Sequence, residues 1–349
     1  MTEKLTITRS IFLSMLEEAI KDIRLKKLPV NIKLLRKYCY LTGHDFKLYE
    51  SRNLIPPGFL MTFTTRLFTE LFILFFTKHS SVIKGLIHSS SKVELFRPFS
   101  LNVDYYQGIL EVKNVKEKTG RKGKFFVVDI EVRLMDENNV KILSDLHQFF
   151  LKYNETAKIQ KWAKTRLFHK INPLKLLHLI YLGFVHSDFL RNHKKIKSKG
   201  VENSIIDVKT IRFEDIQEGD HFLETRIKVD RDTYSEYNRL IHEFNPLHFS
   251  KTYANYLGFR NIVVAGIYTF SFIPQIIEKW AGKTVRITNI NIIYKNPIYI
   301  NETIVQKALI SKKYSKENKN YIECEIIVND MDGNLLTQAM VTYNHRFSR

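Results

Sequence analysis

The hydrophobic pattern of this 349-residue chain occurs twice, once in each half. A glycine precedes a long apolar segment both times: Gly58 before residues 59–76, and Gly266 before the segment that begins at Ile267. Runs rich in β-forming residues follow, with matching examples at 125–132 and 321–328. Because a repeated pattern indicates a repeated structural unit, we expect two similarly folded halves.

Turn signals indicate how the strands of each half are connected. Residues 135–139 and 331–335 contain Asp, Asn or Gly between two β-rich runs and predict hairpins. Residues 92–98 and 291–297 each predict a strand that ends near an aromatic residue and a proline. The order is a long helix and then several strands joined by hairpins. This order predicts an antiparallel sheet packed on one long helix, which is an α+β fold.

Residues 232–269 are the most informative segment and predict two helices separated by a tight turn. Thr233 begins a capping-box pattern that is typical of a helix start. The buried face of this helix consists of four residues at helical spacing: Tyr237, Leu240, Ile241 and Phe244. The helix must end before Pro246, because the residue preceding a proline is disfavoured in helical backbone. Asn245 is then a good N-cap for the next helix, and Gly258 a natural terminator.

This turn can bring reactive side chains together. Glu243 leaves the end of the first helix and His248 lies in the first turn of the next, so both can point into one cleft. A carboxylate that faces an imidazole can hold a water molecule and move protons to and from it. Eighteen residues later, Gly266 begins the long helix, where an unpaired N–H and the helix dipole favour developing negative charge. These groups can add water beside a thioester carbonyl, or remove it.

Composition is ordinary for a soluble globular protein, with 44% hydrophobic and 26% charged residues. Arg66 and Glu70 interrupt residues 59–76, so we expect a buried helix there rather than a membrane span. Cys39 and Cys324 lie far apart and predict neither a disulfide framework nor a thiolate metal site. The start of the chain lacks a signal-peptide pattern, so the expected location is cytoplasmic.

The net charge of +19 favours a polyanionic partner: nucleic acid, a membrane surface, an acidic carrier protein or a phosphate-bearing cofactor. A lysine-rich composition shared by a whole genome would produce the same charge. Residues 158–199 contain eleven Lys or Arg and one acidic residue, Asp188. This segment either contacts an anion or a membrane surface, or is a solvated linker helix with one packed face; we favour the linker.

The sequence predicts three parts: an N-terminal half at residues 1–152, a basic connector at 153–204, and a C-terminal half at 205–349. The reactive turn lies in the C-terminal half. At the matching place, the N-terminal half has Gly-His-Asp-Phe at residues 43–46, and no Asn-Pro-x-His pattern follows. We therefore expect the N-terminal half to be a degenerate partner.

A longer motif surrounds the turn and the glycine. It reads Glu243-x-Asn245-Pro246-x-His248, then Gly258-Phe259, then Val264-Ala265-Gly266-Ile267-Tyr268-Thr269. The motif resembles the signature of the MaoC-like, R-specific enoyl-thioester hydratases and dehydratases. That signature reads Asp-x-Asn-Pro-hydrophobic-His, then Gly-Phe, then Ala-His-Gly-Met-x-Thr. The resemblance covers residues 211–346 well and the first half more weakly.

The resemblance implies two hotdog-fold halves, each an antiparallel sheet wrapped around a long central helix. It implies that Glu243 and His248 bind and activate water, that Asn245 orients the turn, and that the Gly266 N–H polarises the thioester carbonyl. Substrate contacts are expected at four further positions: Ala265, Ile267, Tyr268 and Gly58. The degenerate half would line a tunnel for the acyl chain.

Two positions depart from the family signature. The family's aspartate is Glu243 here, and its longer side chain can displace the water. The family's histidine before the glycine is Ala265 here, which removes a side chain that the mechanism does not obviously need. The pair of carboxylate and imidazole is retained, so catalysis remains the leading expectation.

The leading hypothesis is a hydro-lyase of fatty-acid metabolism that reversibly hydrates a trans-2-enoyl thioester to the (3R)-hydroxyacyl thioester. The substrate would be carried on CoA or acyl carrier protein. No metal or cofactor is implied, and a homodimer is compatible with the resemblance. The second hypothesis is a non-catalytic acyl-thioester-binding or accessory protein, in which Glu243 marks loss of activity. Nucleic-acid binding by the connector is a third hypothesis, not expected because the connector lacks a recognised motif.

Overall fold

The computed structural model of the chain describes residues 3–23, 27–79, 82–120, 123–159, 211–222, 224–243, 245–281 and 285–345. Of the predicted connector, residues 153–159 are described, and the rest lies outside the described residues. Phe244, which the sequence predicts on a buried helix face, also lies outside them.

In the first half, short helices precede one long helix, and the long strands follow it. The elements are β1 (Glu3–Thr6), α1 (Arg9–Lys21), β2 (Lys27–Pro29), α2 (Ile32–Thr42), α3 (Phe46–Ser51), the 3₁₀ turn η1 (Pro57–Phe59), α4 (Leu60–His79), β3 (Ile83–Leu95), β4 (Tyr105–Gly120), β5 (Gly123–Met135), β6 (Lys141–Tyr153) and β7 (Thr156–Ile159).

The second half repeats this order, with α9 in the place of α4 and β9–β12 in the place of β3–β6. Its elements are the 3₁₀ turn η3 (Phe213–Asp215), β8 (Thr225–Lys228), α7 (Arg231–Ile241), the 3₁₀ turn η4 (Pro246–His248), α8 (Lys251–Tyr256), α9 (Gly266–Ala281), β9 (Val285–Tyr294), β10 (Thr303–Lys316), β11 (Lys319–Asn329) and β12 (Leu335–His345).

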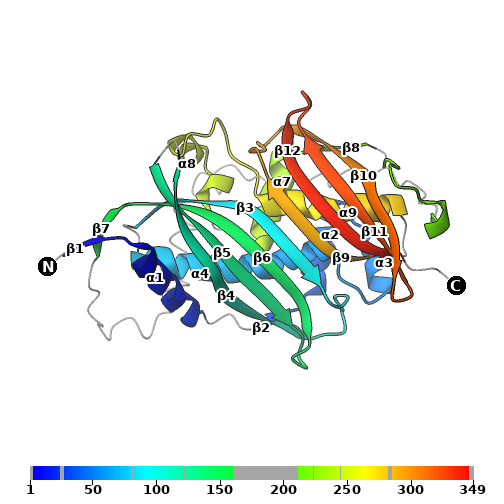
Figure 1. The fold of residues 1–349 in the computed structure, drawn as a ribbon, viewed down its shortest axis with the longest axis horizontal. Coiled ribbons are helices and arrows are strands. Elements are labelled where there is room, and N and C mark those ends of the chain that lie inside the picture. Colours follow the sequence, from blue (N-terminus) through cyan, green and yellow to red (C-terminus); the bar gives the residue numbers. More distant parts are fainter. Residues whose placement is uncertain are drawn as a thin grey trace.

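The two halves share one antiparallel sheet of ten strands in the order β2-β4-β5-β6-β3-β9-β12-β11-β10-β8. The order of the second half mirrors that of the first, and the halves join where β3 pairs with β9, from Ser90 opposite Ile293 to Glu94 opposite Asn289. The curved sheet lies in front of α4 and α9 in Figure 1. Each half is therefore an antiparallel sheet around one long helix, as the sequence predicts.

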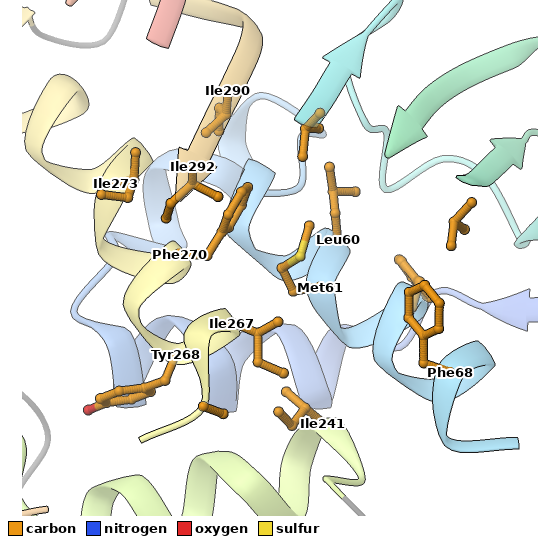
Figure 2. Close-up of a cluster of buried hydrophobic side chains, with 14 of the residues drawn as sticks. Leu60, Met61, Phe68, Ile241, Ile267, Tyr268, Phe270, Ile273, Ile290 and Ile292 are labelled. Atoms are coloured by element: carbon orange, nitrogen blue, oxygen red, sulfur yellow. The ribbon is translucent and has the colours of Figure 1, made fainter. Parts of the chain in front are cut away.

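The core lies between this sheet and the two long helices. Figure 2 shows a cluster that combines α4, α9 and β9: Leu60, Met61, Ile267, Phe270, Ile290 and Ile292. The segment Pro57–Phe76 is long and apolar enough to cross a membrane, but 72% of its most apolar window is buried inside the protein. Its packing is that of a core helix, in line with the sequence prediction.

Helix α7 begins three residues before the predicted start. Its N-cap is Asp230, whose side chain accepts hydrogen bonds from the backbone N–H groups of Asp232 and Thr233. The prediction of Thr233 as the cap was therefore wrong. Aspartate caps a helix at least as well as threonine, and the Thr233 hydroxyl lies 3.0 Å from the Asp230 carboxylate.

The helix predicted to start at Pro246 is divided in two. Asn245 does act as an N-cap, since its side chain accepts from the Leu247 N–H, but it caps only the 3₁₀ turn η4. Ser250 then caps the separate helix α8 by accepting from Tyr253 N–H. Gly258 follows this helix with a φ of +90°, as expected of a helix terminator.

Candidate functional site

The turn after α7 is held by its own polar side chains. His242 ends α7 in the left-handed region with a φ of 60°. A carboxylate oxygen of Glu243 then accepts a hydrogen bond from the Asn245 backbone N–H at 2.9 Å. The amide of Asn245, which is buried, donates to the carbonyl of Leu86 in β3 at 3.2 Å. The turn is therefore attached to the sheet of the first half.

His248 has a defined orientation. Its Nδ1 lies 2.9 Å from the Val263 carbonyl oxygen, which can only accept, so the partner assigns the proton to Nδ1. The Nε2 of the neutral ring is then a bare acceptor, and within the described parts of the chain no side chain or backbone group donates to it. Asn238 donates to the His248 carbonyl at 3.1 Å and fixes the backbone beneath the ring.

Helix α7 also positions the start of α9. The Ala265 N–H donates to the Tyr234 hydroxyl at 2.8 Å, and the Tyr237 hydroxyl donates to the Ile267 carbonyl at 3.0 Å. Gly266, between these two residues, is the first residue of α9, where a backbone N–H has no partner inside the helix. No described group accepts this N–H.

Residue 266 must be glycine because of Tyr294 in β9. A Cβ at this position would lie 2.6–2.8 Å from three carbons of the Tyr294 ring, closer than real Cβ atoms approach other heavy atoms. The missing side chain therefore lets the ring pack directly on the helix start. The close packing of Tyr294 on the start of α9 therefore depends on glycine at this position.

These groups surround one cavity between the two halves. The centres of water molecules can reach about 50 Å³ of it, which is room for a few waters. The second half contributes Glu243, Asn245, His248, Ala265, Gly266 and Ile267. The first half contributes Thr65, Phe68, Phe72, Leu86, His88, His147 and Phe149. The lining thus combines a few polar groups with apolar walls, as ligand sites generally do.

The structure brings six of the eight predicted site residues to this cavity and leaves two elsewhere. Tyr268 packs edge-on against the rings of Tyr234 and Tyr237, because its side chain points away from that of its helical neighbour Ile267. Gly58 is buried beneath the Tyr38 hydroxyl and beside the backbone of α9. Neither Tyr268 nor Gly58 is among the described residues that line the cavity, and a substrate contact at these two positions stays a prediction.

The matching place in the first half carries structural roles. The Asp45 carboxylate caps α3 by accepting from the Leu48 N–H at 3.2 Å. His44 is buried, its Nδ1 lies 2.8 Å from the Thr42 hydroxyl, and burial lowers the pKa of the ring to about 3. Neither Asp45 nor His44 is among the described residues that line the cavity.

Sequence analysis missed His88 and His147, the two cavity histidines of the first half. His147 lies on β6, where the side chains of Leu143, Asp145, His147 and Phe149 alternate onto the buried face. The Nε2 of His147 lies 2.6 Å from a carboxylate oxygen of Asp145. Aspartate and histidine at core positions of a strand are a detectable signal, because polar residues there need a structural or functional reason.

In the described ranges, no group of three or more His, Cys, Asp or Glu side chains is arranged to hold a metal ion.

Part of the chain is similar in sequence to known proteins. Residues 215–330 match the family described as MaoC like domain. The mitochondrial 3-hydroxyacyl-(acyl-carrier-protein) dehydratase of Arabidopsis thaliana is 31% identical over 102 residues, which are 29% of this chain and 59% of that protein. The chain therefore matches less than two thirds of this relative's length.

Solved structures resemble the whole chain. A MaoC-like dehydratase superposes with a TM-score of 0.63 at 12% identity, over 93% of this chain and 96% of that one. A putative MaoC domain protein dehydratase from Chloroflexus aurantiacus superposes with a TM-score of 0.60 at 12% identity, over 94% of this chain and 97% of that one. A conserved hypothetical protein of Mycobacterium tuberculosis, described as having a double hotdog fold, superposes with a TM-score of 0.57 at 10% identity. The match covers 94% of this chain and 98% of that one.

At these identities the solved structures show the fold, and they confirm the predicted pair of hotdog halves. The family match coincides with the half that contains the Glu243 turn, η4 and the start of α9. Residues 215–330 thus match the family described as MaoC like domain, and they lie in one half of a double hotdog fold.

Proposed function

We propose that the protein is a hydro-lyase that reversibly hydrates trans-2-enoyl thioesters to (3R)-hydroxyacyl thioesters. The Arabidopsis relative, named as a dehydratase of 3-hydroxyacyl-(acyl-carrier-protein), supports this class of reaction. The thioester is carried on CoA or on an acyl carrier protein, both of which are anionic and suit the basic chain.

The arrangement of acceptors and donor around the cavity carries this proposal. The bare Nε2 of His248 and the carboxylate of Glu243 are acceptors, and the N–H of Gly266 is a donor without a described partner. Hydration needs these two kinds of group: acceptors to hold and deprotonate water, and a donor for the oxygen on which negative charge develops.

In the reaction, the water oxygen bonds to C3 of the alkene while electron density moves to the thioester carbonyl oxygen. The N–H of Gly266, at the positive end of α9, stabilises that oxygen. Glu243 and His248 take one proton from the water and return one to C2, so the net change is the addition of H and OH. The apolar side chains of Phe68 and Phe72 in α4 face the acyl chain.

The test follows the absorbance of the conjugated enoyl thioester, which falls as water adds to the double bond. The substrates are crotonyl-CoA, longer enoyl-CoAs and the same acyl groups on carrier protein. Glu243→Gln and His248→Ala should each lower turnover by about 100-fold or more, because a positioned acid or base contributes ~10²–10⁴-fold. Thermal unfolding of both variants should match the native protein. Unchanged turnover in either variant would remove that residue from the mechanism.

A non-catalytic acyl-thioester-binding protein is the alternative, favoured by the glutamate that replaces the family's aspartate. This alternative predicts that native protein binds enoyl-thioesters in calorimetry and converts none of them. Turnover by the native protein excludes it.

A further inference from the structure

His88, on β3 of the first half, lines the same cavity as His248. Three aromatic rings surround it, with centroids 5.0 Å away for His147, 5.1 Å for Phe149 and 5.2 Å for Tyr294. Its Nε2 lies 2.9 Å from the Ser90 carbonyl oxygen. The ring is therefore fixed both by packing and by a hydrogen bond.

A β-bulge places this side chain. The pairing of β3 with β6 shifts between His88 and Ser90, so that Ser89 is an extra residue in the strand. In a regular strand, His88 and Ser91 would face opposite sides, because side chains alternate. The bulge changes the alternation, and both side chains now meet His147 on the buried side. Bulges are frequent beside active sites, where they redirect a side chain.

The neighbours of His88 assign its tautomer. The Ser90 carbonyl can only accept, so the Nε2 of His88 carries a proton. The Nδ1 of His147 lies 3.1 Å from both the Ser91 hydroxyl and the His88 Nε2, and its Nε2 lies 2.6 Å from the Asp145 carboxylate. This network leaves the Nδ1 of His88 as an acceptor, and no described residue donates to it.

His88 also stays neutral. Burial lowers the pKa of its ring well below the usual value, and the nearby His147 and His248 lower it further. A ring with such a depressed pKa is a poor general base, but its bare nitrogen remains a good hydrogen-bond acceptor. His88 and His248 line the same cavity, one from each half.

We infer that His88 is a further catalytic residue, which holds the reacting water together with His248 by accepting one of its hydrogen bonds at Nδ1. The inference rests on the proposed hydration. The water donates one proton toward the Glu243–His248 pair and the other to His88. The first proton leaves the oxygen as the C3–O bond forms. The second stays on the oxygen and becomes the proton of the 3-hydroxyl, so His88 gains and loses no proton. Asp145, His147 and Ser91 are positioning residues that act through His88.

This arrangement assigns a task to the first half. The base and the oxyanion donor come from the second half, but a water that donates only one proton to the Glu243–His248 pair can still rotate about that bond. A second acceptor from β3 fixes the lone pair that attacks C3. A misplacement of about 1 Å can cost ~100-fold in rate. The degenerate half thus contributes to the geometry of the chemical step.

The experiment compares His88→Phe with His88→Asn on the best enoyl-thioester. Phenylalanine keeps a ring in the aromatic packing and removes the acceptor, so kcat should fall by about 100-fold while KM changes by less than about threefold. Asparagine has its side-chain oxygen near the place of Nδ1, so kcat should stay within about tenfold of native. The matched control is His79→Phe, a partly buried histidine of α4 outside the cavity, which should leave turnover unchanged.

A high-resolution crystal structure of the native protein gives a readout that does not depend on variant folding. We expect one water within hydrogen-bond distance of both His88 Nδ1 and His248 Nε2. Native turnover in His88→Phe, an equal loss in both His88 variants, or no shared water would overturn the inference. Absence of turnover in the native protein would instead overturn the proposed function, and the role of His88 in it.

Discussion

Glu243 forms a hydrogen bond that an aspartate can also form. Its carboxylate accepts from the backbone N–H two residues later, at Asn245. Aspartate commonly makes this bond with the same spacing in Asx turns. The extra methylene is therefore accommodated within a turn whose side-chain-to-backbone bond an aspartate could also form.

We predict that Glu243→Asp supports turnover equal to or above that of the native protein. The Asx-type bond would keep the carboxylate in the turn, and Asn245, Pro246 and His248 retain their spacing. The measurement is the turnover number on the best enoyl-thioester. A fall beyond about tenfold would show that the cavity has adjusted to glutamate, since a displacement of about 1 Å can cost ~100-fold.

Asp45→Asn should change neither turnover nor stability appreciably. The Asp45 carboxylate caps α3, and asparagine is an equally good cap, so the free energy of unfolding should change by no more than about 0.5 kcal/mol. Parallel measurements of turnover and urea unfolding test this. A loss of turnover comparable to that of Glu243→Gln would place essential chemistry in the first half at this position.

The residues of the site differ in how far the sequence could predict them. Glu243, His248 and Gly266 belong to one local motif, so their proximity follows from short-range backbone geometry. His88 and His147 come from two strands whose pairing includes a bulge. No local pattern specifies which strands pair or where a bulge falls, so their meeting could not be predicted from sequence spacing.

Among the elements, the start of α9 has the most constrained environment. Gly266 both lines the cavity and accommodates the ring of Tyr294. The Tyr294 ring in turn lies 5.2 Å from that of His88. A side chain at this position would therefore disturb the helix start and a cavity histidine together.

Gly266→Ala should lower both turnover and stability. The new methyl group displaces the Tyr294 ring, and overpacking of this kind typically costs about 1–3 kcal/mol of unfolding free energy. We expect turnover to fall at least tenfold in the same assay. Gly85→Ala is the control, because its Cβ meets only the end of the Leu257 side chain at 3.3 Å. Native-like turnover in Gly266→Ala would contradict the assigned role of this helix start.

Element prediction succeeded where local rules agree. The long apolar segments became α4 and α9, and the predicted hairpins became the β5–β6 and β11–β12 connections. The start of α7 was misplaced because Asp230 and Thr233 are both good caps, and backbone context chose between them. Caps compete within a few residues, and a pattern of residue types alone does not decide that competition.

At the scale of the whole molecule, contacts between the halves extend well beyond the shared sheet. Asn245 donates to Leu86, Lys37 of α2 pairs with Glu236 of α7 at 2.5 Å, and Gln275 of α9 donates to the Thr42 carbonyl at 2.7 Å. The cavity lies among these contacts. Its geometry therefore depends on both halves being folded together.

One cross-half contact titrates near neutral pH. The hydroxyl of Tyr49 in α3 donates to the carboxyl of Glu278 in α9. Burial raises the pKa of Glu278 to about 7, although the bond from Tyr49 and the charges of Arg52 and Lys279 oppose this shift. The folded protein therefore retains a proton on Glu278 at pH values where the unfolded chain has lost it.

The free energy of unfolding should consequently fall as pH rises from about 4.5 to 7. In this window the folded state binds one more proton than the unfolded state, so the slope of the unfolding free energy against pH is negative, and the total loss is at most about 3 kcal/mol.

Glu278→Gln removes the titration and keeps an acceptor for Tyr49. The test is urea unfolding of both proteins between pH 5 and 8. His44 and His88, whose pKa values are lowered, give slopes of the opposite sign, but they are present in both proteins and cancel in the difference. The stability advantage of the variant should therefore grow as pH rises through this window. A difference that stays constant with pH would mean that Glu278 is already ionised in the folded protein, and that the α3–α9 contact does not couple the two halves to pH.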